Sequence, residues 1–247
     1  VSLTELSLGG DYIDNVYVTN EIEDISPLAS LVNLESIRMS SNQIEDISPL
    51  GGLGQLLLVV VDENQIVSLA PLADHTNLTD LFVQYNPIED FGALSTLTSL
   101  DSLDLDFTGF QDIAALQGLT ALEYLALGGN EIGDISGIQE LTNLTYLSLS
   151  INRISDISVL ATLDQLTQLY LSSNRIVNIA PLAALAGLSN VRLDDNGITD
   201  ITPLLLSDGI GEGDFLDLSY NPLSQEAVCV DVEALRDSGV TVQLNLP

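Results

Sequence analysis

Leucine and isoleucine recur along this chain at one regular spacing. Within residues 141–163, leucines separated by three, three and two positions lead to Asn152, and an apolar residue then stands near every third position. The two-residue alternation predicts a short strand with one buried face. The three-residue spacing predicts a tight 3-10 or helical turn. One such unit cannot bury its own apolar edge, so the pattern predicts a stack of repeated units.

Asparagine marks the same place in almost every unit. The column, with eight positions on one 22-residue register and a ninth 25 residues later, is Asn20, Asn42, Asn64, Asn86, Asn130, Asn152, Asn174, Asn196 and Asn221. Thr108 fills the one vacant place on that register. An inward asparagine carries both donors and acceptors, so it can satisfy buried backbone groups of its own turn and of a neighbouring turn. We therefore expect a structural role for the column, and the loosest turn at Thr108.

The motif L-x-x-L-x-L-x-x-N-x-I resembles the leucine-rich repeat. The shorter signature N-x-I-x-D-I-x-x-L, seen at Asn42–Leu50, is similar to the internalin-type subclass of bacterial surface proteins. The resemblance covers nearly the whole chain. It implies an α/β solenoid, a curved right-handed leucine-rich-repeat horseshoe with a concave parallel β-sheet and convex 3-10 or short helical turns. Beyond the first repeat, the expected strands lie near 36–40, 58–62, 80–84, 102–106, 124–128, 146–150, 168–172 and 190–194.

The two ends of the chain depart from the repeat. We expect a solenoid of about ten turns over residues 1–223. Extra residues near 9–19 predict either an inserted loop or an edge strand at Val16–Val18. Residues 224–247 predict a C-terminal cap, in which a helix over 225–238 precedes a strand. Because the chain opens in mid-repeat, we interpret it as a fragment of a longer protein.

The charge balance limits the possible partners. The chain has 36 acidic residues against 5 basic ones, all arginine, for a net charge of −31, yet its mean hydropathy is +0.33. Such a charge argues against nucleic acid and anionic membrane surfaces as partners, and the longest apolar run, 56–61, is too short for membrane insertion. Acid excess without lysine is similar to that of proteins from halophilic microbes. A secreted protein of an ordinary microbe is the alternative.

A second polar column follows the asparagines by four residues. Its members are Asp24, Asp46, Ser68, Asp90, Asp112, Asp134, Asp156, Asn178 and Asp200. Each is a residue type that caps helical turns, which predicts a cap on each convex turn. A calcium ladder is the alternative, but calcium takes six to eight oxygens around one point, and Ser68 and Asn178 interrupt the carboxylates. We expect no metal and no other cofactor.

Catalytic chemistry finds little support in the sequence. The single histidine, His75, lies on a connecting segment without a nucleophile motif beside it, and Cys229 is the only cysteine. No phosphate-binding loop, zinc-binding helix motif or nucleophile elbow is present. We predict that the chain is not an enzyme. The alternative is the recognition arm of a larger enzyme whose catalytic domain lies outside these residues.

The outward positions of the predicted strands carry apolar and aromatic side chains. They are Leu58, Val60, Phe82, Tyr124, Tyr146 and Tyr170, with Tyr85 and Phe107 at the rim, Asp62, Asp80, Asp104 and Asp106 beside them, and Arg38 and Arg192 towards the two ends. A run of exposed apolar residues across several strands usually marks a contact surface.

This surface predicts a non-catalytic binding module that is extracellular or on a microbial cell surface. We expect a protein ligand, with a glycan as the other possibility. The chain itself is expected to be monomeric or weakly self-associating. An intracellular scaffold is the alternative within binding proteins.

Overall fold

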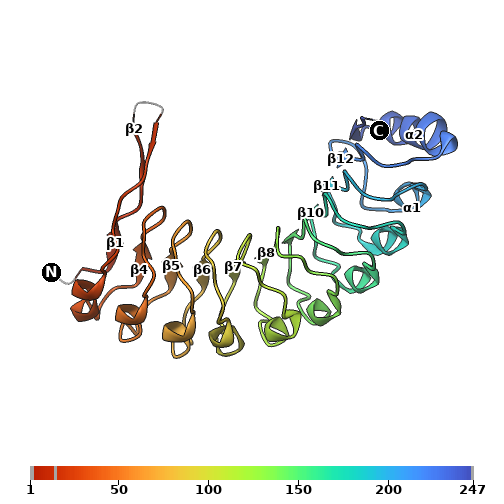
Figure 1. Ribbon diagram of the computed structural model, residues 1–247. Coiled ribbons are helices and arrows are strands. Elements are labelled where there is room, and N and C mark those ends of the chain that lie inside the picture. Colours follow the sequence, from red (N-terminus) through yellow and green to blue (C-terminus); the bar gives the residue numbers. More distant parts are fainter. Residues whose placement is uncertain (1–2, 14–15, 246–247) are drawn as a thin grey trace. The chain divides into compact units, whose positions relative to one another are not determined.

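The computed structural model describes residues 3–13 and 16–245. It divides the chain into two compact units, residues 1–122 and 123–247. Each unit is a run of similar turns, in which a three-residue strand leads to a short 3-10 or helical turn on the opposite side (Figure 1). We call them the first and the second unit.

The strands of each unit form a parallel sheet in chain order. Those of the first unit are β1 (Glu5–Ser7), β4 (Ser36–Arg38), β5 (Leu58–Val60), β6 (Asp80–Phe82) and β7 (Ser102–Asp104). Those of the second unit are β8 (Tyr124–Ala126), β9 (Tyr146–Ser148), β10 (Gln168–Tyr170), β11 (Asn190–Arg192), β12 (Phe215–Asp217) and β13 (Thr241–Gln243). From β4 to β7 and from β8 to β11, paired residues are 22 positions apart, so each repeat adds one strand.

Short helical turns return the chain from one strand to the next. In the first unit they are η1 (Ser26–Ser30), η2 (Ser48–Leu50), η3 (Ala70–Leu72), η4 (Gly92–Thr96) and η5 (Ile113–Leu116). In the second unit they are η6 (Ser136–Ile138), η7 (Ser158–Thr162), η8 (Ala180–Ala184) and α1 (Thr202–Leu205). From β4 to β13 the middle residue of each strand is buried, and each turn from η2 to α1 buries at least one apolar residue. The predicted leucine-rich-repeat solenoid of parallel strands and 3-10 turns is confirmed.

The asparagine column ties each turn to the one before it. Asn64, 2% exposed, donates through Nδ2 to the carbonyls of Met39 (2.9 Å), Val61 (3.1 Å) and Asp62 (3.0 Å). Its Oδ1 accepts from the Ile44 N–H at 3.0 Å. Met39 and Ile44 belong to the preceding turn, so one side chain satisfies buried backbone groups of two successive turns.

Thr108 holds the same buried place with a shorter side chain. It is 3% exposed, and its hydroxyl donates to the Leu105 carbonyl of its own turn at 2.7 Å. Thr108→Asn should leave the free energy of unfolding unchanged or raise it by up to about 2 kcal/mol, because the amide can also reach the preceding turn. Urea unfolding would measure this, with the exposed Thr98→Asn as control. A clear loss of stability confined to Thr108→Asn would contradict the expectation.

The insertion near residues 9–19 contains a small hairpin. β2 (Asp11–Ile13) and β3 (Val16–Val18) pair antiparallel as a separate two-stranded sheet. Val16–Val18 is therefore a strand, but it is not an edge of the parallel sheet. The residues that join the two strands, 14–15, lie outside the described residues.

The last described segment departs from the repeat. The Ser224 hydroxyl accepts from the Ala227 N–H at 3.1 Å, at the start of a helical segment formed by η9 (Ala227–Asp231) and α2 (Val232–Asp237). Gly239 follows with φ +93°, a left-handed conformation in which a Cβ would also crowd Glu212. β13 then pairs with β12. No helix among the described residues is long and apolar enough to cross a membrane.

Candidate functional site

Three tyrosines form a stack on the outward face of the second unit. Tyr124 and Tyr146 occupy paired positions on β8 and β9, and their ring centroids lie 4.3 Å apart with an interplanar angle of 15°. Tyr170 on β10 pairs with Ser148 and so lies diagonally to Tyr146, with its ring centroid 5.2 Å from that of Tyr146 and its plane tilted by 38°. All three residues are half-buried. We call this group, together with Phe215 described next, the aromatic strip.

Arg192 and Phe215 extend the strip across β11 and β12. The guanidinium carbon of Arg192 lies 5.7 Å from the ring centroid of Tyr170 and 5.7 Å from that of Phe215. Both distances suit cation–π contact. The Tyr170 hydroxyl donates to Gln168 Oε1 and accepts from Asn190 Nδ2, each at 3.1 Å. Ring stacking and these hydrogen bonds hold the strip in one arrangement.

The sequence analysis missed Phe215. A 25-residue step separates β11 from β12, because residues 207–213 widen that turn, so a strict 22-residue register misplaces the next strand. Phe215 pairs with Asn190 and precedes the buried Leu216, which is the pattern of an outward strand position. The alternation of outward and buried residues at Phe215 and Leu216 could therefore have identified this strand from the sequence.

The first unit carries a second group of the predicted residues. Val60, Phe82 and Asp104 occupy paired outward positions on β5, β6 and β7, and Leu58 precedes Val60 by two positions on β5. Parallel strands lie about 4.8 Å apart, so neighbouring side chains of this row are within contact range. The structure thus places the predicted binding residues in two groups, one on the sheet of each unit.

Asp104 is the most unusual member of the first group. It is 8% exposed, and its Oδ1 accepts from the Asp106 N–H at 2.9 Å. Burial, with added repulsion from Asp106 and Asp62, raises its pKa to about 7. Burial also raises the pKa of Asp62, although its Oδ1 accepts a 2.6 Å hydrogen bond from the Ser40 hydroxyl.

The rim of the first unit presents a stacked aromatic pair. The ring centroids of Tyr85 and Phe107 lie 4.9 Å apart with an interplanar angle of 8°, and the residues are 52% and 40% exposed. Both have left-handed backbone angles, φ 56° and 54°. Bulky residues adopt this conformation at a cost, so the fold carries large apolar side chains where a small residue would be easier to accommodate.

The nine residues of the second polar column cap the turns, as predicted. Each side chain accepts from the backbone N–H two residues later, as at Asp46 to Ser48 (2.7 Å) and Ser68 to Ala70 (3.1 Å). The same bond is made by Asp24, Asp90, Asp112, Asp134, Asp156, Asn178 and Asp200. The described residues contain no group of three or more histidine, cysteine, aspartate or glutamate side chains placed to hold a metal ion.

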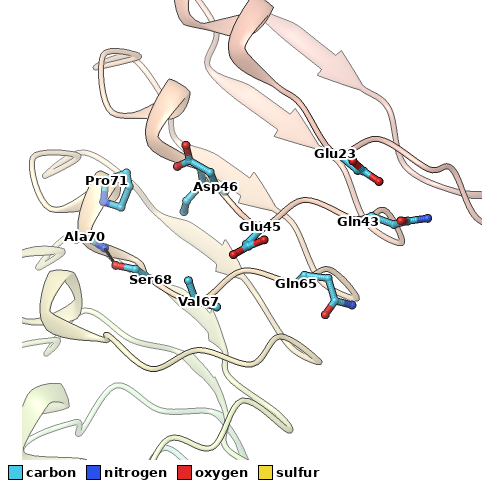
Figure 2. A pocket seen from close by; sticks show the side chains of 10 residues that line it. Glu23, Gln43, Glu45, Asp46, Gln65, Val67, Ser68, Ala70 and Pro71 are labelled. Carbon is cyan, nitrogen blue, oxygen red and sulfur yellow. Dashed lines mark hydrogen bonds between the residues drawn. The ribbon is translucent and has the colours of Figure 1, made fainter.

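A shallow groove of about 780 Å³ lies beside the turns of the first unit, away from the outward strand positions. Figure 2 shows the carboxylates of Glu23, Glu45 and Asp46 along it, with Gln43 and Gln65 at one end. Asp46 already accepts hydrogen bonds from the N–H and the hydroxyl of Ser48. The groove has no aromatic lining residue, so it lacks the anchors that the sheet faces offer.

His75 is a core residue with an unmet hydrogen bond. It is 3% exposed and stands 22 positions from each of the buried Leu53 and Leu97. Its Nε2 is buried and makes no hydrogen bond to a described residue. His75 therefore lies on the predicted connecting segment, between η3 and β6, and its ring occupies a place in the apolar column.

His75→Leu should raise the free energy of unfolding by about 1–3 kcal/mol, because it removes a buried nitrogen without a partner and restores the leucine of the column. Urea unfolding at neutral pH would measure the gain. His75→Gln, which keeps a polar side chain, is the matched control and should not stabilise. A destabilised His75→Leu would show that the imidazole has a partner or a packing role that leucine cannot supply.

Comparison with known proteins agrees with this geometry. A family model described as leucine-rich repeats in two copies matches residues 1–52 and 120–162. Internalin C2 of Listeria monocytogenes is 36% identical over 73% of this chain and 80% of that chain, with a TM-score of 0.70. Internalin InlF of the same species is 27% identical over 94% and 81% of the two chains, with a TM-score of 0.71.

A leucine-rich-repeat protein of Leptospira interrogans shares the fold at 23% identity, over 99% of this chain and 60% of that one, with a TM-score of 0.83. No curated protein matches the chain in sequence. The repeats, the turn chemistry and the identity to internalin C2 agree, and the chain belongs to the internalin-like leucine-rich-repeat proteins.

Proposed function

We propose that this chain is a non-catalytic module that binds a protein partner through the outward face of its sheet, centred on the aromatic strip. The observation that carries the proposal is the strip itself, in which three tyrosines in ring contact and Phe215 occupy outward positions of four strands. Tyrosine and phenylalanine are enriched in protein interfaces, and tyrosine is among the residues that most often contribute large binding energies.

The strip is ordered before any partner arrives. Tyr146 is held between Tyr124 and Tyr170, and the Tyr170 hydroxyl is fixed by hydrogen bonds. Binding would therefore lose little side-chain entropy, which favours affinity. The net charge of −31 would attract a partner with a basic rim and speed its association at low salt.

We further propose that the module acts outside a microbial cell. Its membership of the internalin-like proteins supports this location, because the repeat signature resembles that of bacterial surface proteins. An acidic surface without lysine suits a salty environment, where counterions screen the repulsion between carboxylates. The alternative is a cytoplasmic scaffold. A secretion assay on the full-length gene product that finds the protein only inside the cell would favour this alternative.

The test begins with an unbiased screen of the chain against displayed protein fragments and against a glycan array. With the partner in hand, Tyr146→Ala and Tyr170→Ala should each weaken binding by about 30-fold or more, equivalent to about 2 kcal/mol. Val177→Ala is the control, because Val177 is 59% exposed in the same unit but lies away from the strip. Unchanged affinity in both tyrosine variants would contradict the proposal, and exclusive glycan binding would contradict the choice of partner.

A further inference from the structure

We propose that the sheet face of the first unit receives a basic side chain of the partner, with the stem of an arginine or lysine over Val60 and Phe82 and its cationic head against the carboxylate of Asp104. This inference rests on the proposed function, because it names a chemical feature of the same protein partner. It concerns a different unit from the aromatic strip, so the two can be tested separately.

The row of side chains is suited to such a guest. Val60, Phe82 and Asp104 are in register on adjacent strands, so an apolar surface leads directly to a carboxylate. Arginine and lysine have the complementary form, with an apolar stem and a charged head. A cation near an aromatic ring gains further stabilisation from the ring face.

Asp104 lacks the counter-charge that a buried carboxylate needs. One oxygen accepts the Asp106 N–H, and Asp104 makes no other hydrogen bond and no ion pair among the described residues. Within those residues, ion pairs occur only at Arg153–Glu131 and Arg236–Glu233. A carboxylate that is 8% exposed and has no cationic partner lowers the stability of the fold. A cationic ligand that binds Asp104 would give this carboxylate a function that accounts for its presence.

The second unit contains a related arrangement, with a cationic residue on the neighbouring strand. Asp217 is 6% exposed, and its Oδ1 accepts from the Ser219 N–H two residues later at 2.9 Å, as Asp104 does from Asp106. The side chain paired with Asp217 on the neighbouring strand is Arg192, which lies between two aromatic rings. The side chain paired with Asp104 is Phe82. The chain thus places a guanidinium on the strand next to Asp217, although Arg192 and Asp217 form no ion pair, and leaves the equivalent place next to Asp104 to a partner.

Charge selects the guest. Asp62, Asp80 and Asp106 share this face of the first unit with Asp104, and Arg38 is the one basic residue on its strands β1 and β4–β7 as the structure describes them. Arg38 donates to the Ser36 hydroxyl at 2.8 Å. Burial, with added repulsion from Asp106 and Asp62, raises the pKa of Asp104. A cationic guest would stabilise the buried carboxylate against both effects, whereas an anionic guest would add to the repulsion.

Binding should therefore strengthen with pH. At pH 6 about one tenth of a carboxyl with a pKa of about 7 is ionised, and at pH 8 about nine tenths, so affinity for a cation should rise by about tenfold. Asp62 and Asp106, whose charges add to the effect of burial on this pKa, lie on the same face as Asp80 and Arg38, so these four groups are the charged surroundings of the titration.

The experiment uses two small probes, N-acetyl-L-arginine amide and its uncharged analogue N-acetyl-L-citrulline amide. NMR of the whole chain would follow the ring signals of Phe82 and the carboxyl carbon of Asp104 during titration at pH 8. We expect the arginine probe to shift both signals and to lower the titration midpoint of Asp104. The citrulline probe should bind at least tenfold more weakly.

Asp104→Asn should abolish the response at Phe82, whereas Asp156→Asn should preserve it. Asp156 is the matched control because the same charge is removed from an exposed turn of the other unit. Equal responses to the two probes would overturn the inference, because they would show that the positive charge of arginine plays no part. Equal weakening in the two variants would also overturn it and would indicate attraction to net charge alone. Tyr146→Ala changes the other unit and should not affect binding of the arginine probe. A negative result with the probe would therefore contradict this inference without contradicting the proposed binding of a protein partner by the aromatic strip.

Discussion

Replacing Asn152 by alanine is expected to lower the free energy of unfolding by about 3–5 kcal/mol, because several buried backbone groups would lose their partners at about 1–3 kcal/mol each. Asn152 is 8% exposed. Its Nδ2 donates to the carbonyls of Leu127, Leu149 and Ser150, and its Oδ1 accepts from the Ile132 N–H at 2.8 Å. Urea unfolding followed by circular dichroism would measure the loss.

The matched control is Asn33→Ala, which removes an exposed asparagine outside the column. It should change the unfolding free energy by less than about 0.5 kcal/mol. If the two variants were equally stable, backbone groups around Asn152 would have to find other partners, and the column would have no structural role. If the unfolding transition became less cooperative in Asn152→Ala alone, this would show that Asn152 couples the unfolding of its own turn to that of the preceding turn.

Asp104→Asn is expected to stabilise the protein at pH 8 by about 2–4 kcal/mol. The pKa of Asp104 is about 7 in the folded chain and near its ordinary value of 3.8 in the unfolded chain. Above pH 7 the carboxylate is ionised in both states, so folding carries the full penalty of burying the charge. Between pH 7 and pH 4 the folded state takes up the proton, and the penalty declines as pH falls.

The gain from Asp104→Asn should accordingly be largest at pH 8 and nearly absent at pH 4. Chemical unfolding at three pH values between these limits would give the profile. Asp156→Asn serves as the control, since hydrogen bonds to the N–H and hydroxyl of Ser158 lower the pKa of Asp156, and its removal should not stabilise. A gain for Asp104→Asn that is independent of pH would show that packing, and not charge, limits stability at this site.

The fold could be predicted from the sequence because the same residue types recur at fixed positions of the 22-residue repeat. A leucine at a fixed position can only be buried if every turn stacks on the next, and the asparagines at 42, 64 and 86 fix the spacing of those turns. The hairpin at Asp11–Val18 could not be placed in the same way, because it occurs once and has no column to align it. Phe215 was missed for a similar reason, at a turn of unusual length.

The chemistry of the candidate site was less accessible from sequence. Outward positions follow from alternation, so Tyr146, Phe82 and Asp104 could be placed on the sheet face. Whether Tyr146 would stack and Asp104 would be covered depends on neighbours one and two repeats away, and on side-chain angles that alternation does not specify. His75 lies on a connecting segment, between η3 and β6, as predicted, but its burial was not predicted because a single imidazole interrupts an otherwise apolar column.

The 22-residue register also bears on how such a chain can change over generations. The side-chain amides of Asn152, Asn174 and Asn196 donate to their own turn and to the turn before it, so gain or loss of one whole repeat between β8 and β11 would preserve the same kind of contact. A duplication in the gene that matches the repeat would move Arg192 and Phe215 one strand further from Tyr146 while preserving the buried ladder. Ligand preference could then evolve through a change in the number of strands between these residues, without any substitution in the core.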